Sequence, residues 1–268
     1  MWDAVAPSGG TLVSQLDPNS VLGKVEAILD ALAEDGTTVG LSAPARPSGA
    51  PTASVHRLRA DLGTRGAAER AGDGCRRGAR LFELGSRVPS QRGLRDLALP
   101  YLEELLVACG HSVHLAVPVD DAVLYLDKLM VHRSVPTPSE VANRVPLHAT
   151  ATGKAILAFG ESSMTQDLLV KPLDRYTDRT LTDPADLAHD LGETRARGYS
   201  VEWEEFADGY ASMGAPLIGL GGRVAGAVAV TTAVDDLDVD RIAAALLTTT
   251  SRISERLGAP PTRSRSLG

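Results

Sequence analysis

The chain has 268 residues, of which 43% are hydrophobic and 23% charged, a balance typical of a soluble globular protein with one large or two ordinary domains. No apolar run approaches the length of a membrane span, and the N-terminus lacks the features of a signal peptide, so a cytoplasmic protein without a membrane partner is expected. The net charge of −7 excludes a uniformly basic nucleic-acid coat protein.

The charge is unevenly distributed along the chain. Eleven arginines and four acidic residues lie between Leu41 and Arg95, so this segment carries +7 while the whole chain carries −7. A basic N-terminal third on an acidic body is typical of a DNA-contacting module joined to a different domain. A solvated arginine-rich linker would give the same counts, so the charge alone leaves both interpretations open.

The N-terminal third predicts short elements separated by breaks. Residues 1–20 are rich in Pro, Gly and Ser and are expected to be disordered. Ser20 is a good N-cap, and helical spacing of apolar residues predicts a first helix from Val21 that ends by Gly36. After three prolines, the segment "TASVHRLRADLG" returns to helical spacing, and Asp73-Gly74 predicts a tight hairpin.

The order of helix, break, polar helix and basic hairpin is that of a winged helix-turn-helix. In such a module, hydroxyls at a helix start bind phosphates, His and Arg reach base edges in the major groove, and arginines on the wing contact the adjacent backbone. The predicted DNA contacts are Thr52, Ser54, His56, Arg57 and Arg59 on the helix and Arg70, Arg76 and Arg77 on the hairpin. For any single arginine, the alternative is a solvated surface residue.

Beyond this module the sequence predicts a linker helix and a domain of mixed helices and strands. The segment "GLRDLALPYLEELLVACG" has a helical apolar stripe, with Pro100 expected to kink it. Strands are expected in "HSVHLAVPV", "AVLYLDKLM", "SEVANRVPLH" and "YSVEWEEF", and in a final hairpin turning at Gly221-Gly222. Helices are expected over 161–170, 183–197 and 238–257. Because strands and helices do not alternate regularly, an antiparallel α+β domain is predicted.

The segment "LHATATGKAILAF", residues 147–159, places a Gly-Lys pair at the start of an apolar helix. A phosphate-binding P-loop needs a glycine five positions before that glycine and a Ser or Thr after the lysine, but His148 and Ala155 occupy those positions. Nucleotide binding is therefore not expected. The unpaired amides and the dipole of such a helix start favour another anion, unless Thr150 only caps its own helix.

Enzymatic alternatives have weaker support. In "GYASMG", Tyr210 stands where a nucleophile elbow around Ser212 needs glycine. The histidines His111, His114, His132 and His148 lack metal-ligand spacing with a carboxylate, and Cys75 and Cys109 are expected to be ordinary buried or half-buried thiols. Alternation along a strand would place Glu202 and Glu204 on one face and Glu205 on the other, which argues against an acid-base pair. No enzyme activity, metal or cofactor is predicted.

Several motifs together resemble one family. The strings "VPLHATATGKAILAF" and "RARGYSVEWEEFADGYASMGAPLIGLGGRVAGAVAVTT" resemble the effector-binding domain of IclR-family bacterial transcriptional regulators, and "VLGKVEAILDALAEDG", "SVHRLRADL" and "LFELGSRV" resemble the same family's winged helix and linker. The resemblance implies a small-molecule-responsive DNA binder, such as a repressor, that forms a homodimer or homotetramer. It also implies that the effector-binding domain has a GAF-like sheet with a ligand pocket. The expected effector is a small organic or aromatic acid.

The resemblance also implies a domain division and a set of ligand contacts. The expected parts are a disordered N-terminus (1–20), a winged helix-turn-helix that binds a double-stranded operator (21–78), a linker helix (79–94), an effector-binding domain (95–257) and a disordered tail (258–268). The implied ligand contacts are Ala151, Thr152, Gly153, Glu202, Ser212, Ala229 and Thr231. Gly153 is expected to let the ligand approach because it has no side chain. Ala227, Ala229 and Thr231 share one face of a strand, although a tightly packed sheet would show the same small residues.

The sequence departs from the family pattern in its N-terminal module. Pro44 and Pro47 lie where the family's second helix runs, and Arg59, Gly63, Ala67 and Cys75 replace larger apolar or aromatic groups. A proline in a helix interior costs about 3 kcal/mol or more, so a weakened winged helix is expected. A small-molecule sensor with impaired DNA binding is therefore the main alternative function, and a hydrolase is the weaker one.

Overall fold

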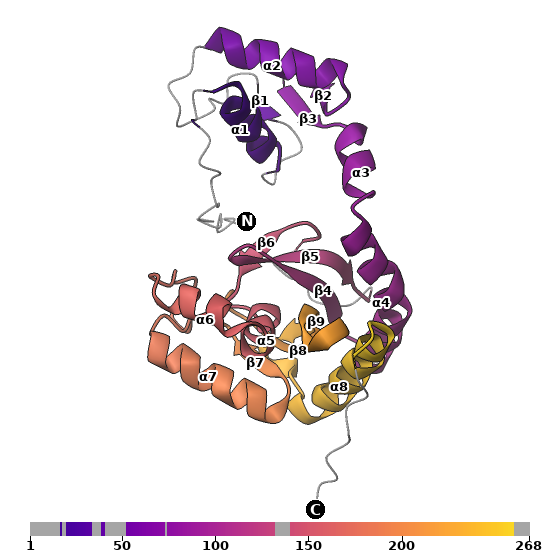
Figure 1. The fold of residues 1–268 in the computed structure, drawn as a ribbon, viewed down its shortest axis with the longest axis vertical. Helices are drawn as coiled ribbons and strands as arrows, with labels where there is room; N and C mark the ends of the chain where they lie inside the picture. The colour runs from indigo at the N-terminus through magenta and orange to yellow at the C-terminus, as the bar shows by residue number, and fades with distance from the viewer. Residues whose placement is uncertain are drawn as a thin grey trace, which may run out of the picture. The chain divides into compact units, whose positions relative to one another are not determined.

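The computed structural model describes Asp17 and residues 20–33, 39–40, 52–72, 74–131 and 140–259 (Figure 1). The chain divides into two compact units, with the boundary between Arg92 and Gly93, inside helix α4 (Pro89–Cys109). The predictions made for residues 1–16, for the prolines of 41–51 and for the tail from 260 lie outside the described residues. Among the described helices, none is both long and apolar enough to cross a bilayer.

The N-terminal unit has the elements of the expected winged helix. Its elements are α1 (Val21–Ala33), β1 (Val39–Gly40), α2 (Thr52–Thr64), β2 (Ala68–Ala71), β3 (Gly74–Arg77) and α3 (Ala79–Gly85). The strands form an antiparallel sheet in the order β1-β3-β2. Ser20 caps α1 as predicted, because its Oγ accepts a hydrogen bond from the amide of Gly23 at 3.0 Å. The core is small: Ile28, Leu32 and Ala68 are buried, with half-buried side chains from α2 and Cys75 around them.

The C-terminal unit is built on one six-stranded antiparallel sheet in the order β6-β5-β4-β9-β8-β7, which confirms the α+β fold. The strands are β4 (Ser112–Val119), β5 (Ala122–Leu129), β6 (Arg144–Pro146), β7 (Ser200–Trp203), β8 (Tyr210–Ile218) and β9 (Val224–Ala233). The helices are α4, α5 (Ala151–Phe159), α6 (Ser162–Leu169), α7 (Pro184–Arg197) and α8 (Val239–Arg256). The helix α7 begins at the Asp183 cap and ends at Gly198 in the left-handed region, as the sequence predicts.

Helices cover both faces of this sheet (Figure 1). The helices α4 and α8 pack on one face over a core that includes Val228 and Val230, while α5, α6 and α7 cover the other face over a core that includes Ala227. The alternation predicted for β9 therefore holds, since its valines face α4 and α8 and its alanines face α5. The small residues of β9 thus lie under the start of α5.

Two predicted strands are shorter than the sequence suggests. Only Arg144–Pro146 of "SEVANRVPLH" is described as a strand, and β7 ends at Trp203. Glu204 has a φ of 54°, in the left-handed region, so the chain turns at the point where alternation was expected to continue. The prediction that Glu205 lies on the opposite face from Glu202 is therefore wrong, as the site below shows.

Candidate ligand-binding site

The start of α5 is held by its own loop. Thr150 caps the helix: its hydroxyl donates to the carbonyl of Pro146 at 2.8 Å and accepts from the amide of Gly153 at 3.2 Å. A Cβ on Gly153 would lie only 2.2 Å from the carbonyl oxygen of Leu147. The missing side chain thus lets the loop pack against the helix, and the contact of Gly153 with a ligand stays a prediction.

The sheet positions this helix start through equally close contacts. A Cβ on Gly214 of β8 would lie 2.5 Å from the carbonyl oxygen of Ala151, so only glycine allows α5 to sit this near the sheet. Ser200 of β7 donates its hydroxyl to the same Ala151 carbonyl at 2.6 Å. The backbone of the first helical turn is therefore fixed against β7 and β8.

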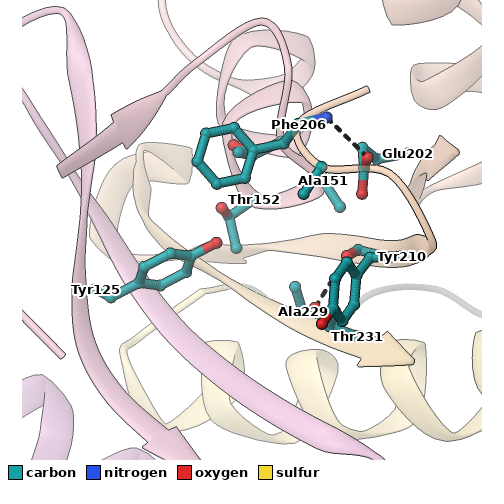
Figure 2. A pocket seen from close by; sticks show the side chains of 11 residues that line it. Tyr125, Ala151, Thr152, Glu202, Phe206, Tyr210, Ala229 and Thr231 are labelled. Atoms are coloured by element: carbon teal, nitrogen blue, oxygen red, sulfur yellow. Dashed lines mark hydrogen bonds between the residues drawn. The ribbon is translucent and has the colours of Figure 1, made fainter. Parts of the chain in front are cut away.

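A cavity of about 30 Å³ lies where this helix start faces the sheet (Figure 2). Its lining consists of Tyr125, Thr150, Ala151, Thr152, Glu202, Phe206, Ala207, Tyr210, Ser212, Ala229 and Thr231. About 10–15 Å³ suffices for one water molecule, so the cavity is small. Six of the seven ligand contacts implied by the resemblance line it, and Gly153 does not. Their role as ligand contacts stays a prediction.

Hydroxyl groups line much of the cavity. Ser212 and Thr231, on adjacent strands, share a hydrogen bond of 2.9 Å, and Thr231 also lies 3.4 Å from Nδ1 of His114. The Thr152 hydroxyl is buried and makes no well-formed hydrogen bond with a described residue. It faces the Tyr125 hydroxyl (Figure 2). Burial raises the pKa of Tyr125 to about 12, and the Thr152 hydroxyl opposes that rise. These groups can donate hydrogen bonds to a guest in the cavity.

Glu202 is the acidic group of the lining and is only 3% exposed. Its Oε1 accepts a hydrogen bond from the backbone N–H of Glu205 at 2.6 Å. It also accepts one from the backbone N–H of Phe206 at 3.2 Å (Figure 2). Burial raises the pKa of Glu202 to about 7; the amide of Phe206 opposes this rise and the charge of Glu205 adds to it. The carboxyl group therefore fixes the loop that closes the cavity, and it titrates near neutral pH.

Lys154, the lysine of the Gly-Lys pair, is fully buried and does not line the cavity. Its Nζ lies 2.6 Å from Oε1 of Glu205 and 3.2 Å from Oδ2 of Asp190, and Arg197 lies 3.8 Å from the other oxygen of Asp190. A P-loop lysine must reach its phosphates, whereas this one is an internal counterion. The structure thus supports the sequence argument against nucleotide binding.

Five lining residues were not predicted from the sequence: Tyr125, Thr150, Phe206, Ala207 and Tyr210. Tyr125 lies on β5, whose buried and half-buried residues alternate, and this alternation was the available signal. Phe206 and Ala207 lie in the turn after β7, where no periodicity applies. The hydroxyls of Thr177 and Thr180 hold this turn through the carbonyls of Glu204 and Glu205, both at 2.6 Å.

The histidines and thiols named above can be followed where they lie among the described residues. Among the described residues, no group of three His, Cys, Asp or Glu side chains is placed to hold a metal ion, and His132 lies outside those residues. The hydroxyl of Ser212 bonds to Thr231, and His148 bonds to the carbonyl of Asp174 at 2.9 Å. Cys109 is buried and Cys75 is half-buried, as expected.

The candidate DNA contacts lie on α2 and on the β2–β3 hairpin. His56 and Arg57 are exposed on α2, opposite the face that packs Val55, Leu58 and Leu62, while Ser54 and Arg59 are half-buried. The side chain of Thr52 lies outside the described residues. Arg70, Arg76 and Arg77 are exposed on the hairpin, and Arg76 pairs with Glu69 at 3.1 Å. Arg57 is therefore more exposed than Arg59, and it is the arginine of α2 that is better placed to reach a base edge.

Comparison with known proteins identifies the family. Residues 87–255 match the family model described as bacterial transcriptional regulator IclR C-terminal. The chain belongs to the IclR family. The glycerol operon regulatory protein of Streptomyces griseus is 31% identical over 245 residues, which cover 89% of this chain and 96% of that protein.

Two further relatives of this IclR-family protein extend the comparison. The HTH-type transcriptional regulator BhcR of Paracoccus denitrificans is 35% identical over 180 residues, which are 66% of this chain and 64% of BhcR, less than two thirds of its length. The crystal structure of an IclR homolog complexed with 4-hydroxybenzoate, from Microbacterium hydrocarbonoxydans, has a TM-score of 0.81 and 28% identity, covering 90% of this chain and all of that one. The similarity to solved structures therefore extends through both units of the chain.

Proposed function

We propose that this IclR-family protein is a transcriptional regulator whose residues 95–257 bind a small organic acid and whose residues 21–78 bind a double-stranded DNA operator. The observation that carries the proposal is the cavity at the start of α5, where the helix N-terminus and the hydroxyls of Thr152, Ser212 and Thr231 converge. A helix N-terminus and convergent hydroxyl donors favour a carboxylate. The protein would act as a homodimer or homotetramer in the cytoplasm.

The size of the cavity narrows the class of acid. A volume of about 30 Å³ has room for about two or three water molecules, so lining side chains must move for any acid, and they must move least for a short hydroxy or oxo acid. Calorimetry and thermal unfolding with glycolate, pyruvate, benzoate and 4-hydroxybenzoate test this preference. A ligand at about a hundred times its Kd should stabilise the protein by roughly 2.7 kcal/mol. If none of these acids binds, the proposed effector class is wrong.

Filling the cavity should weaken effector binding. Ser212→Leu places a larger apolar side chain between Glu202 and Thr231 and removes the hydroxyl, so the affinity for the tightest-binding acid should fall by at least about tenfold. Calorimetry of the folded variant measures this loss. Ser163→Leu, at an exposed position of α6, is the matched control and should bind like the wild type. An unchanged affinity in Ser212→Leu would place the effector elsewhere.

Arg57 should contribute directly to operator recognition. Operators selected from a random DNA library should bind Arg57→Ala more weakly by about 1–3 kcal/mol, the range for a lost bidentate base contact. The control is Arg223→Ala, which removes an exposed arginine of the C-terminal unit. Equal affinities of the wild type and Arg57→Ala would remove this assignment. Failure to select any operator would favour the alternative of a sensor without DNA binding, for which the small core around Ile28 and Leu32 is the supporting observation.

A further inference from the structure

The cavity presents an electrostatic problem for an acidic ligand. Among the described residues that line it, none is Lys, Arg or His, and Glu202 is the carboxyl group. Two ionised carboxylates in one buried site repel each other, and burial also penalises each charge. An anion can therefore occupy this cavity favourably only if the charge of Glu202 is removed or neutralised.

The geometry of Glu202 leaves one of its oxygens available. Oε1 is held by the backbone N–H groups of Glu205 and Phe206, so the carboxyl group cannot turn away without releasing the loop. Oε2 makes no hydrogen bond with a described residue, while the side chain lines the cavity (Figure 2). A proton on Oε2 could therefore be donated to a molecule bound in the cavity.

The cation whose charge acts on Glu202 is Lys154, and it is already shared by two other carboxylates. Lys154 from α5 lies 2.6 Å from Glu205 and 3.2 Å from Asp190 of α7, so two carboxylates compete for its charge. Tyr125 from β5 and Tyr210 from β8 also line the cavity, and the charge of Glu202 adds to burial in raising the pKa of the Tyr125 phenol. Burial raises the pKa of Glu202 to about 7, and the Phe206 amide and Lys154 do not overcome this effect. The surroundings therefore allow Glu202 to gain a proton at little cost near neutral pH.

We propose that Glu202 is protonated when the effector is bound and that it donates the proton from Oε2 in a hydrogen bond to the effector's carboxylate. The proton comes from solvent, and the ligand carboxylate stays ionised, so one proton is taken up for each acid bound above neutral pH. The proposal rests on the proposed function, since it requires an acidic effector. It makes Glu202 a determinant of specificity for a ligand group that accepts a hydrogen bond.

The pH dependence follows from proton linkage. At a pH below the pKa of Glu202 the proton is already present, so the affinity for the acid should be constant. Above that pKa, each pH unit lowers the protonated fraction tenfold, and the Kd should rise by about tenfold per unit. The carboxyl groups of the probe acids all ionise below about pH 5, so they do not titrate in this range.

The test uses the full chain and the tightest binder among glycolate, pyruvate, benzoate and 4-hydroxybenzoate. Calorimetry at pH 6 and pH 8, in buffers with different heats of ionisation, counts the protons taken up. We expect close to one proton per ligand at pH 8 and little uptake at pH 6. Glu202→Gln keeps an acceptor for the loop amides and a donor for the ligand, so it should bind with an affinity independent of pH and without uptake. Glu193→Gln, exposed on α7, is the control and should behave like the wild type.

Each result decides between the proposals. Binding of an acid by the wild type without proton uptake at pH 8 would overturn the role of Glu202 and leave the proposed effector class intact. The same pH dependence in Glu202→Gln as in the wild type would assign the proton to another group. Loss of binding in a folded Glu202→Gln would show that the ionised carboxylate is needed as an acceptor, which also contradicts the proposal. Failure of every acid to bind the wild type would reject both the effector class and this inference.

Discussion

Replacing Lys154 by methionine should destabilise the C-terminal unit by about 3–5 kcal/mol, the range for removal of one partner from a buried ion pair. The variant leaves Glu205 and Asp190 in the interior without their common cation. Burial raises the pKa of Glu205, so in the variant this carboxyl group should become protonated instead of staying charged. Urea denaturation should therefore show a large loss at pH 8 and a smaller loss at pH 5.

Two further variants separate a buried charge from a general packing effect. Lys171→Met removes an exposed lysine that lies 3.5 Å from Asp121, and it should change the stability by at most about 1 kcal/mol. In the Lys154→Met background, Glu205→Leu removes an unpaired carboxylate and should restore part of the lost stability. If Lys154→Met is as stable as the wild type at pH 8, the lysine is not the counterion that holds this cluster.

Gly153→Ala should cost at least the 1–3 kcal/mol typical of an overpacked core. The new Cβ would lie 2.2 Å from the carbonyl oxygen of Leu147, and this neighbour is backbone that cannot rotate away. Because the loop and the first turn of α5 must then separate, the affinity for the acid should fall as well. Denaturation and calorimetry of the same protein sample measure the two effects.

Gly192→Ala is the matched control for this substitution. Gly192 lies inside α7, and a Cβ there would meet no atom within 4 Å. Alanine is the better helix former by about 1 kcal/mol, so this variant should be neutral or slightly more stable. Equal stability of Gly153→Ala and the wild type would contradict the close packing of the loop on the helix.

The sequence predicted most of the fold because its signals are local. The caps at Ser20 and Asp183, the glycine after α7 and the alternation of β9 each depend on residues near them in the chain, and the structure contains all of these features. The prediction for Glu202–Glu205 was wrong because alternation applies only while the strand continues. The turn at Glu204 is stabilised by Thr177 and Thr180, which lie 24 or more residues away and give no local signal.

The Gly-Lys pair is a second case in which the sequence predicted the local structure but not the contacts with distant residues. The apolar neighbours of Lys154 in "ATGKAILAF" indicate a buried helix, since a helix that is apolar on all sides lies in a core. The partners of this lysine, Asp190 and Glu205, are far along the chain, so its pairing could not be derived from spacing. The packing of Leu147 against Gly153 was not predicted, because a glycine in a sequence indicates a close approach without indicating which group approaches.

Ser212 on β8 and Thr231 on β9 form one wall of the cavity. The direction of their hydrogen bond depends on the His114 ring. Burial lowers the pKa of His114 to about 3, so its imidazole is neutral and only one of its nitrogens carries a proton. With the proton on Nδ1, the order of donation runs from His114 to Thr231 to Ser212, and Ser212 directs its own proton at the guest. With the proton on Nε2, the order reverses and Ser212 offers a lone pair instead. The tautomer of a histidine outside the cavity lining therefore determines whether this wall favours an anion or a hydrogen-bond donor.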